Sequence, residues 1–263
     1  MEPAFRSLLY DRPDLYDLVF PEPDQTRAEM CGEAFKRYLP LPPASLVDIG
    51  CGNGRLVASL SASVPECWGV DLVESNIAYP RSRGRAGVFH VGDMRTVRLG
   101  RTFDVVTCLG NALSYMLADA DLEKTITTFA THARPGSLLI LDLLNARCYL
   151  EGDGFRERIE GRIEAPEFTA DSVAVHSLDR AARRMRRTRT WRIAGQPDVV
   201  DDSEYRLLYP EETRGILEAG GFEVLAMYDN REFRDSDLAG SVTSEPDCAG
   251  MRGRKLYVFA MMP

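Results

Sequence analysis

The chain has 263 residues, of which 44% are hydrophobic and 27% charged, values typical of a globular protein with a substantial core. Its net charge of −8 disfavours DNA or RNA as a partner, because a nucleic-acid binder needs a positive surface to neutralise phosphates. No apolar run reaches the length of a membrane-spanning helix. The N-terminal stretch MEPAFRSLLYDRPDLYDLVF also lacks the basic start of a secretory leader. We therefore expect a cytoplasmic protein without a membrane partner.

The cysteines predict no metal site. The chain has six (Cys31, Cys51, Cys67, Cys108, Cys148 and Cys248), with no CxxC spacing and no Cys/His pairing of the kind zinc sites use. Without a secretory leader we expect these thiols to be reduced and mostly buried.

The first part of the chain alternates helices and strands behind an N-terminal helical cap, residues 1–40. Apolar strands separated by helices predict a parallel sheet covered on both faces. Ligands bind such sheets at the carboxyl ends of the strands. The expected helices are 24–39, 54–62, 75–82 and 119–133, and the expected strands are 45–50, 67–71, 87–93, 103–110 and 137–144.

From about residue 155 the pattern changes: polar and apolar residues alternate with a period of two, without intervening helices, as in RERIEGRIEA and RRMRRTRTWRI. This pattern predicts an antiparallel insert, solvated on one face. We assign it to residues 151–208, after a core of residues 41–150, and place it as a lid over the ligand crevice. A helix (210–219) and strands at 222–228 and 254–262 then complete the sheet within 209–263. The chain is thus predicted to form one α/β domain.

A glycine-rich turn, DIGCGNG (Asp48–Gly54), follows the first predicted sheet strand. It lacks the G-x-G-x-x-G spacing of a dinucleotide site, but its glycines let the backbone approach a ligand closely. Three later motifs lie at the ends of the strands that follow this turn. Asp71 ends the next strand, where an acid can accept from ribose hydroxyls. GDMR places Asp93 and Met94 where they can contact an adenine ring, and CLGN adds Gly110 and Asn111. Together they predict a nucleoside site with room for a small polar tail.

With these motifs the sequence resembles the class I S-adenosylmethionine-dependent methyltransferases. The resemblance implies a Rossmann-like sheet of seven strands with the last one antiparallel, and S-adenosylmethionine as the cofactor. It places Asp48, Gly50, Gly52 and Gly54 around the methionine part of the cofactor, and Asp71, beside Leu72, at the ribose. Asp93 and Met94 would bind adenine, and Leu109 and Gly110 would lie near the sulfonium. Arg27 is a candidate partner of the methionine carboxylate, or part of a solvated helix face.

Two segments, CLGNALSYM and GDMRTVRLGRTFDVVTCL, look like glycine/sarcosine and amino-sugar N-methyltransferases respectively. The sequence departs from the sugar enzymes at Tyr115, where they have a candidate histidine base. The expected reaction is therefore methyl transfer to a small-molecule amine, such as an amino sugar or an antibiotic intermediate.

We expect five polar side chains around the acceptor: Tyr10, Tyr16, Asn111, Tyr115 and Asn145. Tyr16 would also contact the cofactor. Alternatively, Tyr10 and Tyr16 only hold the N-terminal segment against the fold and contact no ligand. We expect structural roles for the three histidines, His90, His132 and His176. Of these, His176 is the one that could instead line the lid. An amine needs no strong base once it is neutral, whereas a hydroxyl acceptor does, so N-methylation is favoured over O-methylation.

Several alternatives stay open. The arginine run between Arg180 and Arg192 reads either as a solvated or subunit-contacting face, or as a recognition surface for an acidic acceptor. Self-association through the insert is one consequence of the first reading. A small-molecule O-methyltransferase, an NAD-dependent oxidoreductase and a non-catalytic cofactor-binding module are the alternative functions.

Overall fold

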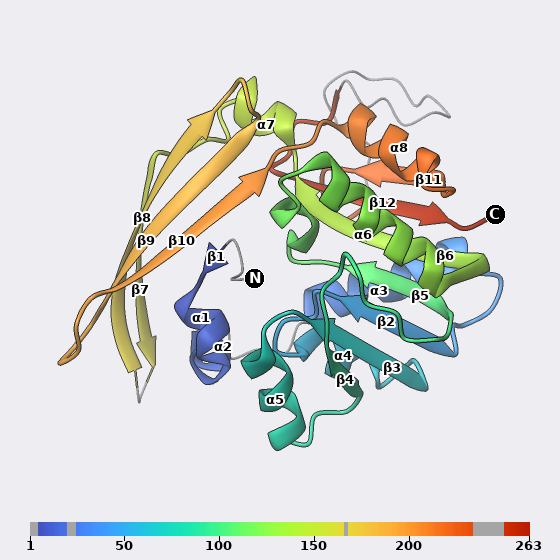
Figure 1. Ribbon diagram of the computed structural model, residues 1–263, viewed down its shortest axis with the longest axis horizontal. Coiled ribbons are helices and arrows are strands. Elements are labelled where there is room, and N and C mark those ends of the chain that lie inside the picture. Colours follow the sequence, from blue (N-terminus) through green and yellow to red (C-terminus); the bar gives the residue numbers. More distant parts are fainter. Residues whose placement is uncertain (1–4, 20–24, 166–167, 234–249) are drawn as a thin grey trace.

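The computed structural model describes residues 5–19, 25–165, 168–233 and 250–263. Seven strands form one sheet in the order β11-β12-β6-β5-β2-β3-β4. They are β2 (Ser45–Ile49), β3 (Glu66–Asp71), β4 (Val88–Val91), β5 (Phe103–Cys108), β6 (Ala133–Leu144), β11 (Glu223–Tyr228) and β12 (Lys255–Met261). Only β12 runs against its neighbours β6 and β11. The predicted fold class is thereby confirmed, including the antiparallel last strand (Figure 1).

Helices cover both faces of this sheet, as the apolar strands predict. Apolar side chains of α3 (Gln25–Tyr38) and α4 (Arg55–Leu60) pack on one face. Those of α6 (Asp119–His132) and α8 (Pro210–Ala219) pack on the other. The helix α5 (Glu74–Ser82) joins β3 to β4. Predicted and observed element boundaries agree within a few residues throughout this part of the chain.

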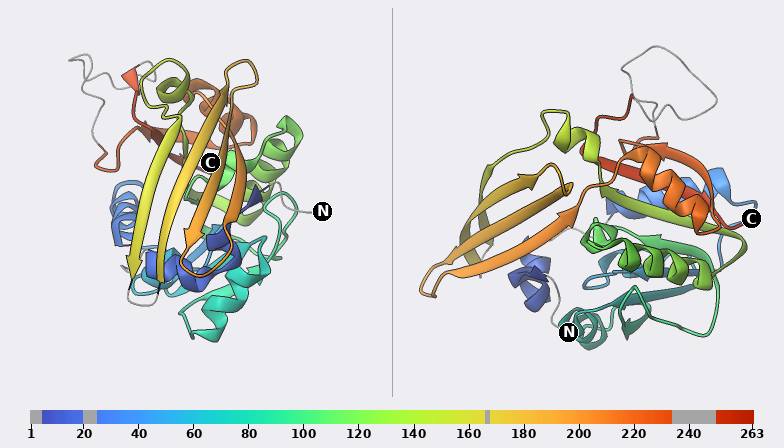
Figure 2. Two further views of the ribbon diagram at one scale, coloured as in Figure 1. Left: turned by 90° about the vertical axis from the view of Figure 1, so that its left-hand side faces the viewer. Right: turned by 45° about the horizontal axis from the view of Figure 1, so that its top comes forward.

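The insert is a separate antiparallel sheet that stands beside the core (Figures 1 and 2). Its order is β1-β10-β9-β8-β7. The insert's own strands are β7 (Arg158–Ala165), β8 (Phe168–Asp179), β9 (Arg184–Ile193) and β10 (Val199–Arg206). The fifth strand, β1 (Phe5–Arg6), comes from the N-terminus and pairs with β10, Phe5 opposite Ser203. The sequence did not predict this strand, because two residues carry no readable alternation.

The N-terminal cap fills the space between the two sheets. Its helices α1 (Leu8–Asp11) and α2 (Pro13–Val19) place Leu9 and Leu15 against Trp191 and Ile193 of the insert. At the other end of the insert, Met185 and Tyr205 pack with α7 (Ala146–Leu150) of the core. The insert's inner face is therefore anchored at both ends by apolar clusters.

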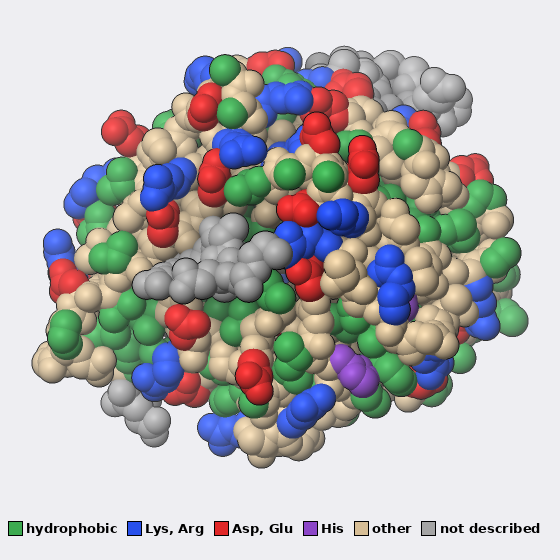
Figure 3. All heavy atoms as spheres, viewed as in Figure 1, with side chains coloured by type: hydrophobic (Ala, Val, Ile, Leu, Met, Phe, Trp, Pro, Cys, Tyr) green, Lys and Arg blue, Asp and Glu red, His purple; other side chains and the backbone are tan. Residues whose placement is uncertain are grey.

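Surface features agree with the composition. Basic and acidic side chains are interspersed over the face shown in Figure 3. Among the described residues, no helix has the length and hydropathy needed to cross a membrane. The five described cysteines are buried, as predicted, and Cys248 lies outside the described residues.

Candidate functional site

A cavity of about 550 Å³ lies at the carboxyl ends of β2, β3 and β5. Its volume is typical of small-molecule sites, which span roughly 300–1,000 Å³. Most residues expected from the sequence line it: Tyr10, Tyr16, Arg27, Asp48, Gly50, Gly52, Asp71, Leu72, Asp93, Met94, Leu109, Gly110 and Tyr115. The chain order of these motifs thus corresponds to one contiguous site.

The glycine-rich turn brings bare backbone to the cavity wall. Gly50 has φ +87, and a Cβ there would lie 2.8 Å from the Cβ of Ala112. Gly52 has φ +54, and a Cβ there would meet nothing within 4 Å. Both conformations favour glycine, and at position 50 the close approach of Ala112 excludes a side chain as well. The neighbouring Asp48 is 3% exposed, and its Oδ1 accepts a hydrogen bond from Thr107 Oγ1 (2.7 Å).

Asp71 is fixed by three donors. The amide of Gly52 donates to Oδ2 (2.8 Å), while the amide of Val73 (2.9 Å) and Nδ2 of Asn76 (3.2 Å) donate to Oδ1. A carboxylate offers about four acceptor positions, so Oδ2 keeps capacity for a ligand hydroxyl. Burial raises the pKa of Asp71 above its ordinary value.

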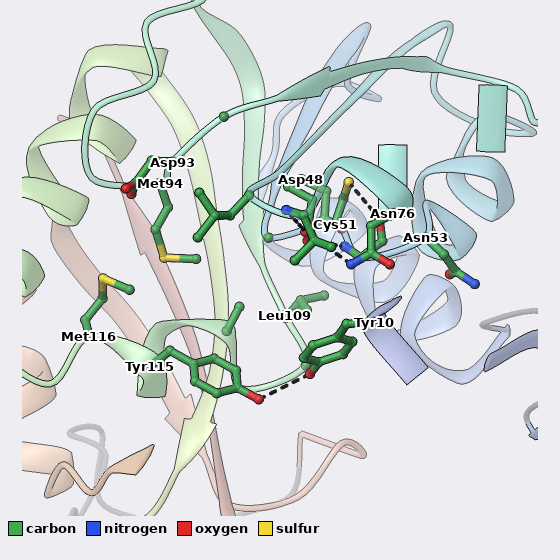
Figure 4. A pocket seen from close by; sticks show the side chains of 18 of the residues that line it. Tyr10, Asp48, Cys51, Asn53, Asn76, Asp93, Met94, Leu109, Tyr115 and Met116 are labelled. Carbon is green, nitrogen blue, oxygen red and sulfur yellow. Dashed lines mark hydrogen bonds between the residues drawn. The ribbon is translucent and has the colours of Figure 1, made fainter. Parts of the chain in front are cut away.

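Asp93 is held by Arg95 in a two-pronged ion pair. Arg95 Nε lies 2.9 Å from Oδ1 and Nη2 lies 2.5 Å from Oδ2. This guanidinium lowers the pKa of Asp93, so the carboxylate stays ionised at neutral pH. Arg95 also contacts Asp121 (3.2 Å). Met94 points into the cavity from the same loop (Figure 4).

Tyrosine hydroxyls close the opposite end of the cavity. Tyr10 and Tyr115 point toward one another, with their hydroxyl oxygens 3.3 Å apart (Figure 4). Tyr115, at the end of the short helix η1 (Ala112–Tyr115), also donates to the hydroxyl of Tyr205 on β10 (3.3 Å). Burial raises the pKa of Tyr10 to about 12 and raises that of Tyr115 well above its usual range. Both side chains therefore remain protonated hydrogen-bonding groups at neutral pH.

Comparison with known proteins identifies this arrangement. A family model described as a methyltransferase domain matches residues 46–136, the segment that holds the glycine turn, Asp71, Asp93 and Gly110. Residues 46–136 thus form a class I S-adenosylmethionine-dependent methyltransferase domain. The predicted enzyme class and cofactor are thereby confirmed.

The relatives of this methyltransferase include amino-sugar N,N-dimethyltransferases. It is 31% identical over 132 residues to a dTDP-3-amino-3,6-dideoxy-alpha-D-glucopyranose N,N-dimethyltransferase of Streptomyces fradiae, covering 49% of this chain and 51% of that one. A dTDP-3-amino-3,4,6-trideoxy-alpha-D-glucopyranose N,N-dimethyltransferase of Streptomyces venezuelae is 22% identical, with 94% of this chain and 97% of the relative covered.

The fold has a solved counterpart. A cofactor-bound amino pentose methyltransferase from Micromonospora echinaspora superposes with a TM-score of 0.71 at 22% identity, covering 98% of both chains. This similarity extends over the insert and the N-terminal segment as well as the core, so the whole architecture of the methyltransferase is shared.

Three predicted residues lie elsewhere than expected. Gly54 does not line the cavity; it precedes α4 with φ +76, and a Cβ there would lie 2.4 Å from the ring of Phe89. Asn111 is also absent from the cavity wall, and its backbone N–H donates to Asp142 Oδ1 (2.6 Å). Asn145 is fully buried and caps α7. Its Nδ2 donates to the carbonyls of Met251 (3.1 Å) and Gly253 (2.8 Å). Gly54, Asn111 and Asn145 therefore do not line the cavity.

The histidines lie away from the cavity wall. His132 is fully buried, with Nε2 accepting from the amide of Leu99 (3.0 Å). His90 stacks on Trp68, with ring centroids 4.9 Å apart. His176 lies on the strand β8 of the insert, opposite Arg187.

Some functional neighbours were not predicted. Asn76 orients Asp71, and its position in the first turn of α5 was the only available signal. Arg95 follows Asp93 in the GDMR motif but was not singled out. Tyr205 had no signal at all, because its contact with Tyr115 joins residues 90 positions apart. Arg184 also lines the cavity, from the strand β9.

Proposed function

We propose that this methyltransferase N-methylates the amino group of a small amino-sugar acceptor. The observation that carries the proposal is the pair of protonated tyrosine hydroxyls, Tyr10 and Tyr115, at the end of the cavity opposite Asp71 and Asp93. Such groups can orient a neutral amine but cannot strongly deprotonate an alcohol. The amino-sugar dimethyltransferase whose alignment covers 94% of this chain supports the same acceptor class.

The proposed cofactor contacts follow from the cavity wall. Asp71 would accept from the ribose hydroxyls through Oδ2, held in place by Gly52 and Asn76. Asp93 and Met94 would contact the adenine ring. Gly50 and Gly52 would leave room for the methionine part, and Arg27 lies close to Gly110, with Nη2 3.8 Å from where a Cβ would be. An arginine there is suited to the methionine carboxylate.

The reaction needs little acid–base chemistry from the protein. The bound cofactor supplies an activated methyl group, so the chain contributes alignment and exclusion of water. Tyr115 and Tyr10 would hold the acceptor amine by accepting hydrogen bonds from its N–H groups, which leaves the nitrogen lone pair free to attack the methyl group. Met94, Leu109 and Met116 give the adjoining wall an apolar surface, which favours the neutral amine over its ammonium form.

The test is product analysis. The purified protein is incubated with S-adenosylmethionine and the amino sugars that its relatives methylate, beside a matched sugar with a hydroxyl in place of the amine. The proposal expects mass gains of one or two methyl groups on nitrogen and none on the hydroxyl sugar. Methylation of the hydroxyl sugar would support the O-methyltransferase alternative, and NADH binding would support the oxidoreductase alternative. Cofactor binding without turnover of any acceptor would favour the non-catalytic module.

Two further expectations remain predictions. Self-association through the insert would use its outer face, where Val175 and Val200 are exposed. Light scattering of the purified protein tests it, and a monomer at all concentrations would contradict it. A cytoplasmic location is tested by fractionation of the producing cells.

A further inference from the structure

The cap helices α1 and α2 are tied to the cofactor end of the core through α5. Ser75 and Tyr79 lie four residues apart on α5, so their side chains share one face of that helix. Ser75 Oγ donates to the carbonyl of Tyr10 on α1 (2.9 Å), and the Tyr79 hydroxyl donates to Asp17 Oδ2 on α2 (2.9 Å). One face of α5 therefore holds both cap helices, each by a hydrogen bond.

Asp17 also contacts the glycine-rich turn itself. Its Oδ1 accepts from Nδ2 of Asn53 (2.9 Å), the residue between Gly52 and Gly54, and its Oδ2 accepts from Nη2 of Arg85. Nη1 of the same Arg85 donates to the carbonyl of Asn53 (2.5 Å). Asn53 is 6% exposed and belongs to the cavity wall (Figure 4). Asp17, Asn53 and Arg85 thus form a closed ring of hydrogen bonds at the turn.

The Asp17–Arg85 ion pair is better shielded from water than the Asp14–Arg12 pair, which lies within the cap. The side chains of Asp17 and Arg85 are 26% and 19% exposed, against 40% and 54% for Asp14 and Arg12. Shielded pairs are screened less by salt and contribute more than exposed ones. Burial and then the hydrogen bond to Asp17 raise the pKa of Tyr79, so its hydroxyl stays a donor at neutral pH.

Asp17 and two of its donors act on the site from outside it. Asp17, Tyr79 and Arg85 do not belong to the cavity wall that the described residues form. Their neighbours Tyr16 and Asn53 do belong to it. The contacts of Asp17 therefore fix where the wall stands and do not themselves bind a ligand.

We propose that Asp17 is a positioning residue that holds the cap against the glycine-rich turn and thereby sets how long S-adenosylmethionine stays bound. Without these contacts α2 would carry Tyr16 away from the cavity wall, and Asn53 would lose its partner. Tyr10 belongs to the same cap, so the tyrosine pair at the acceptor end would loosen as well. The proposal concerns the cofactor end of the cavity and holds whichever acceptor the enzyme uses.

Cofactor exchange measures the effect of Asp17 directly. Protein loaded with labelled S-adenosylmethionine is mixed with excess unlabelled cofactor, and the label that stays bound is followed with time. Asp17→Asn keeps the size of the side chain but loses the charge that pairs with Arg85. It should raise the dissociation rate constant about 10- to 100-fold, the usual effect of losing hydrogen bonds to a charged group.

Two further variants test the assignment. Tyr79→Phe removes one of the three donors to Asp17 and should raise the dissociation rate constant about 3- to 10-fold. Asp14→Asn is the matched control, because it removes a carboxylate from the same helix but breaks an ion pair within the cap. It should leave cofactor dissociation unchanged.

Two other measurements distinguish positioning from a general loss of structure. An untied cap obstructs the cavity less, so the association rate constant of Asp17→Asn should equal or exceed that of the wild type, whereas a folding defect would lower it. In the ligand-free protein, amide hydrogen exchange should become faster in α1 and α2 and stay unchanged in the core strands β2 and β5. Neither measurement needs an acceptor, so both are independent of the amino-sugar proposal.

Two results would overturn the inference. One is a dissociation rate constant of Asp17→Asn equal to that of the wild type. The other is faster dissociation together with slower association and faster exchange throughout the core, which would mark a purely structural role. If Asp17→Asn fails to fold, Tyr79→Phe decides the question, because it leaves the Asp17–Arg85 ion pair in place; unchanged dissociation in that variant would then reject the role of Asp17.

Discussion

The hydroxyl of Tyr10 lies 3.3 Å from the hydroxyl of Tyr115, a contact between residues 105 positions apart. It joins the N-terminal helix α1 to the end of η1, directly after the core strand β5 and its loop. The N-terminal segment is further tied down where Ser75 Oγ donates to the carbonyl of Tyr10 (2.9 Å). The tyrosine pair therefore closes the cavity at its acceptor end and depends on the cap being in place.

Tyr115→Phe should slow turnover without weakening cofactor binding. The change removes one hydroxyl at the acceptor end and leaves the aromatic ring and the distant Asp71 unchanged. Loss of one hydrogen bond corresponds to a decrease in kcat of about 3- to 10-fold. Steady-state kinetics and calorimetry with S-adenosylmethionine measure the two effects. Tyr205→Phe is the matched control, because it breaks the same hydrogen-bonded chain one step outside the cavity wall; an equal effect would assign the role to the chain rather than to Tyr115.

The pH dependence of kcat/KM should follow the acceptor rather than the protein. Only the unprotonated amine reacts, so the rate should fall about tenfold for each pH unit below the pKa of the acceptor amine. Tyr10, with its pKa raised to about 12, stays protonated throughout this range, as does Tyr115. Two acceptors whose amines differ in pKa should give inflections that differ by the same amount. A single inflection shared by both would reveal a titrating group of the enzyme.

Asp71→Asn should weaken S-adenosylmethionine binding by about 10- to 100-fold, the usual value of hydrogen bonds to a charged acceptor. The amide keeps the size of the side chain but replaces one oxygen with a donor, which opposes the amide of Gly52 or the ligand hydroxyl. Asp198→Asn, on the exposed surface of the insert beside Arg192, is the control. Titration calorimetry reports the affinity, and unchanged binding would remove Asp71 from the site.

Gly54→Ala should destabilise the fold more than Gly52→Ala does. Both glycines have positive φ, which costs an alanine about 1–2 kcal/mol. At position 54 the new methyl group would also lie 2.4 Å from Phe89, whereas at position 52 it would meet open space. Overpacking of this kind adds about 1–3 kcal/mol. Thermal or denaturant unfolding measures the difference, and equal stability of the two variants would contradict the assigned role of Gly54.

Local sequence patterns were sufficient to predict most of the strands and helices of the core. The strands that end at Ile49 and Asp71 were readable because apolar runs and glycine turns are local signals. Asp48 and Asp71, at the carboxyl ends of these strands, meet at one edge of the sheet. The inward-facing arginines of β9, Arg187 and Arg189, illustrate what was not readable. Alternation predicted one solvated face of the insert, but which arginines turn inward depends on the register of β9 against β8 and β10, a long-range property. Gly54 and Asn145 were misplaced for the same reason: their neighbours Phe89 and Met251 are distant in sequence.

The pairing of β1 with β10 bears on how this scaffold can be re-engineered. The insert is one continuous stretch of chain and looks exchangeable between relatives as a cassette. Its edge strand and part of one apolar anchor, however, come from the N-terminal segment of the protein. A chimera that imports a foreign insert must therefore import the matching N-terminus as well, and a bulky fusion placed directly before residue 5 would compete with the same sheet edge.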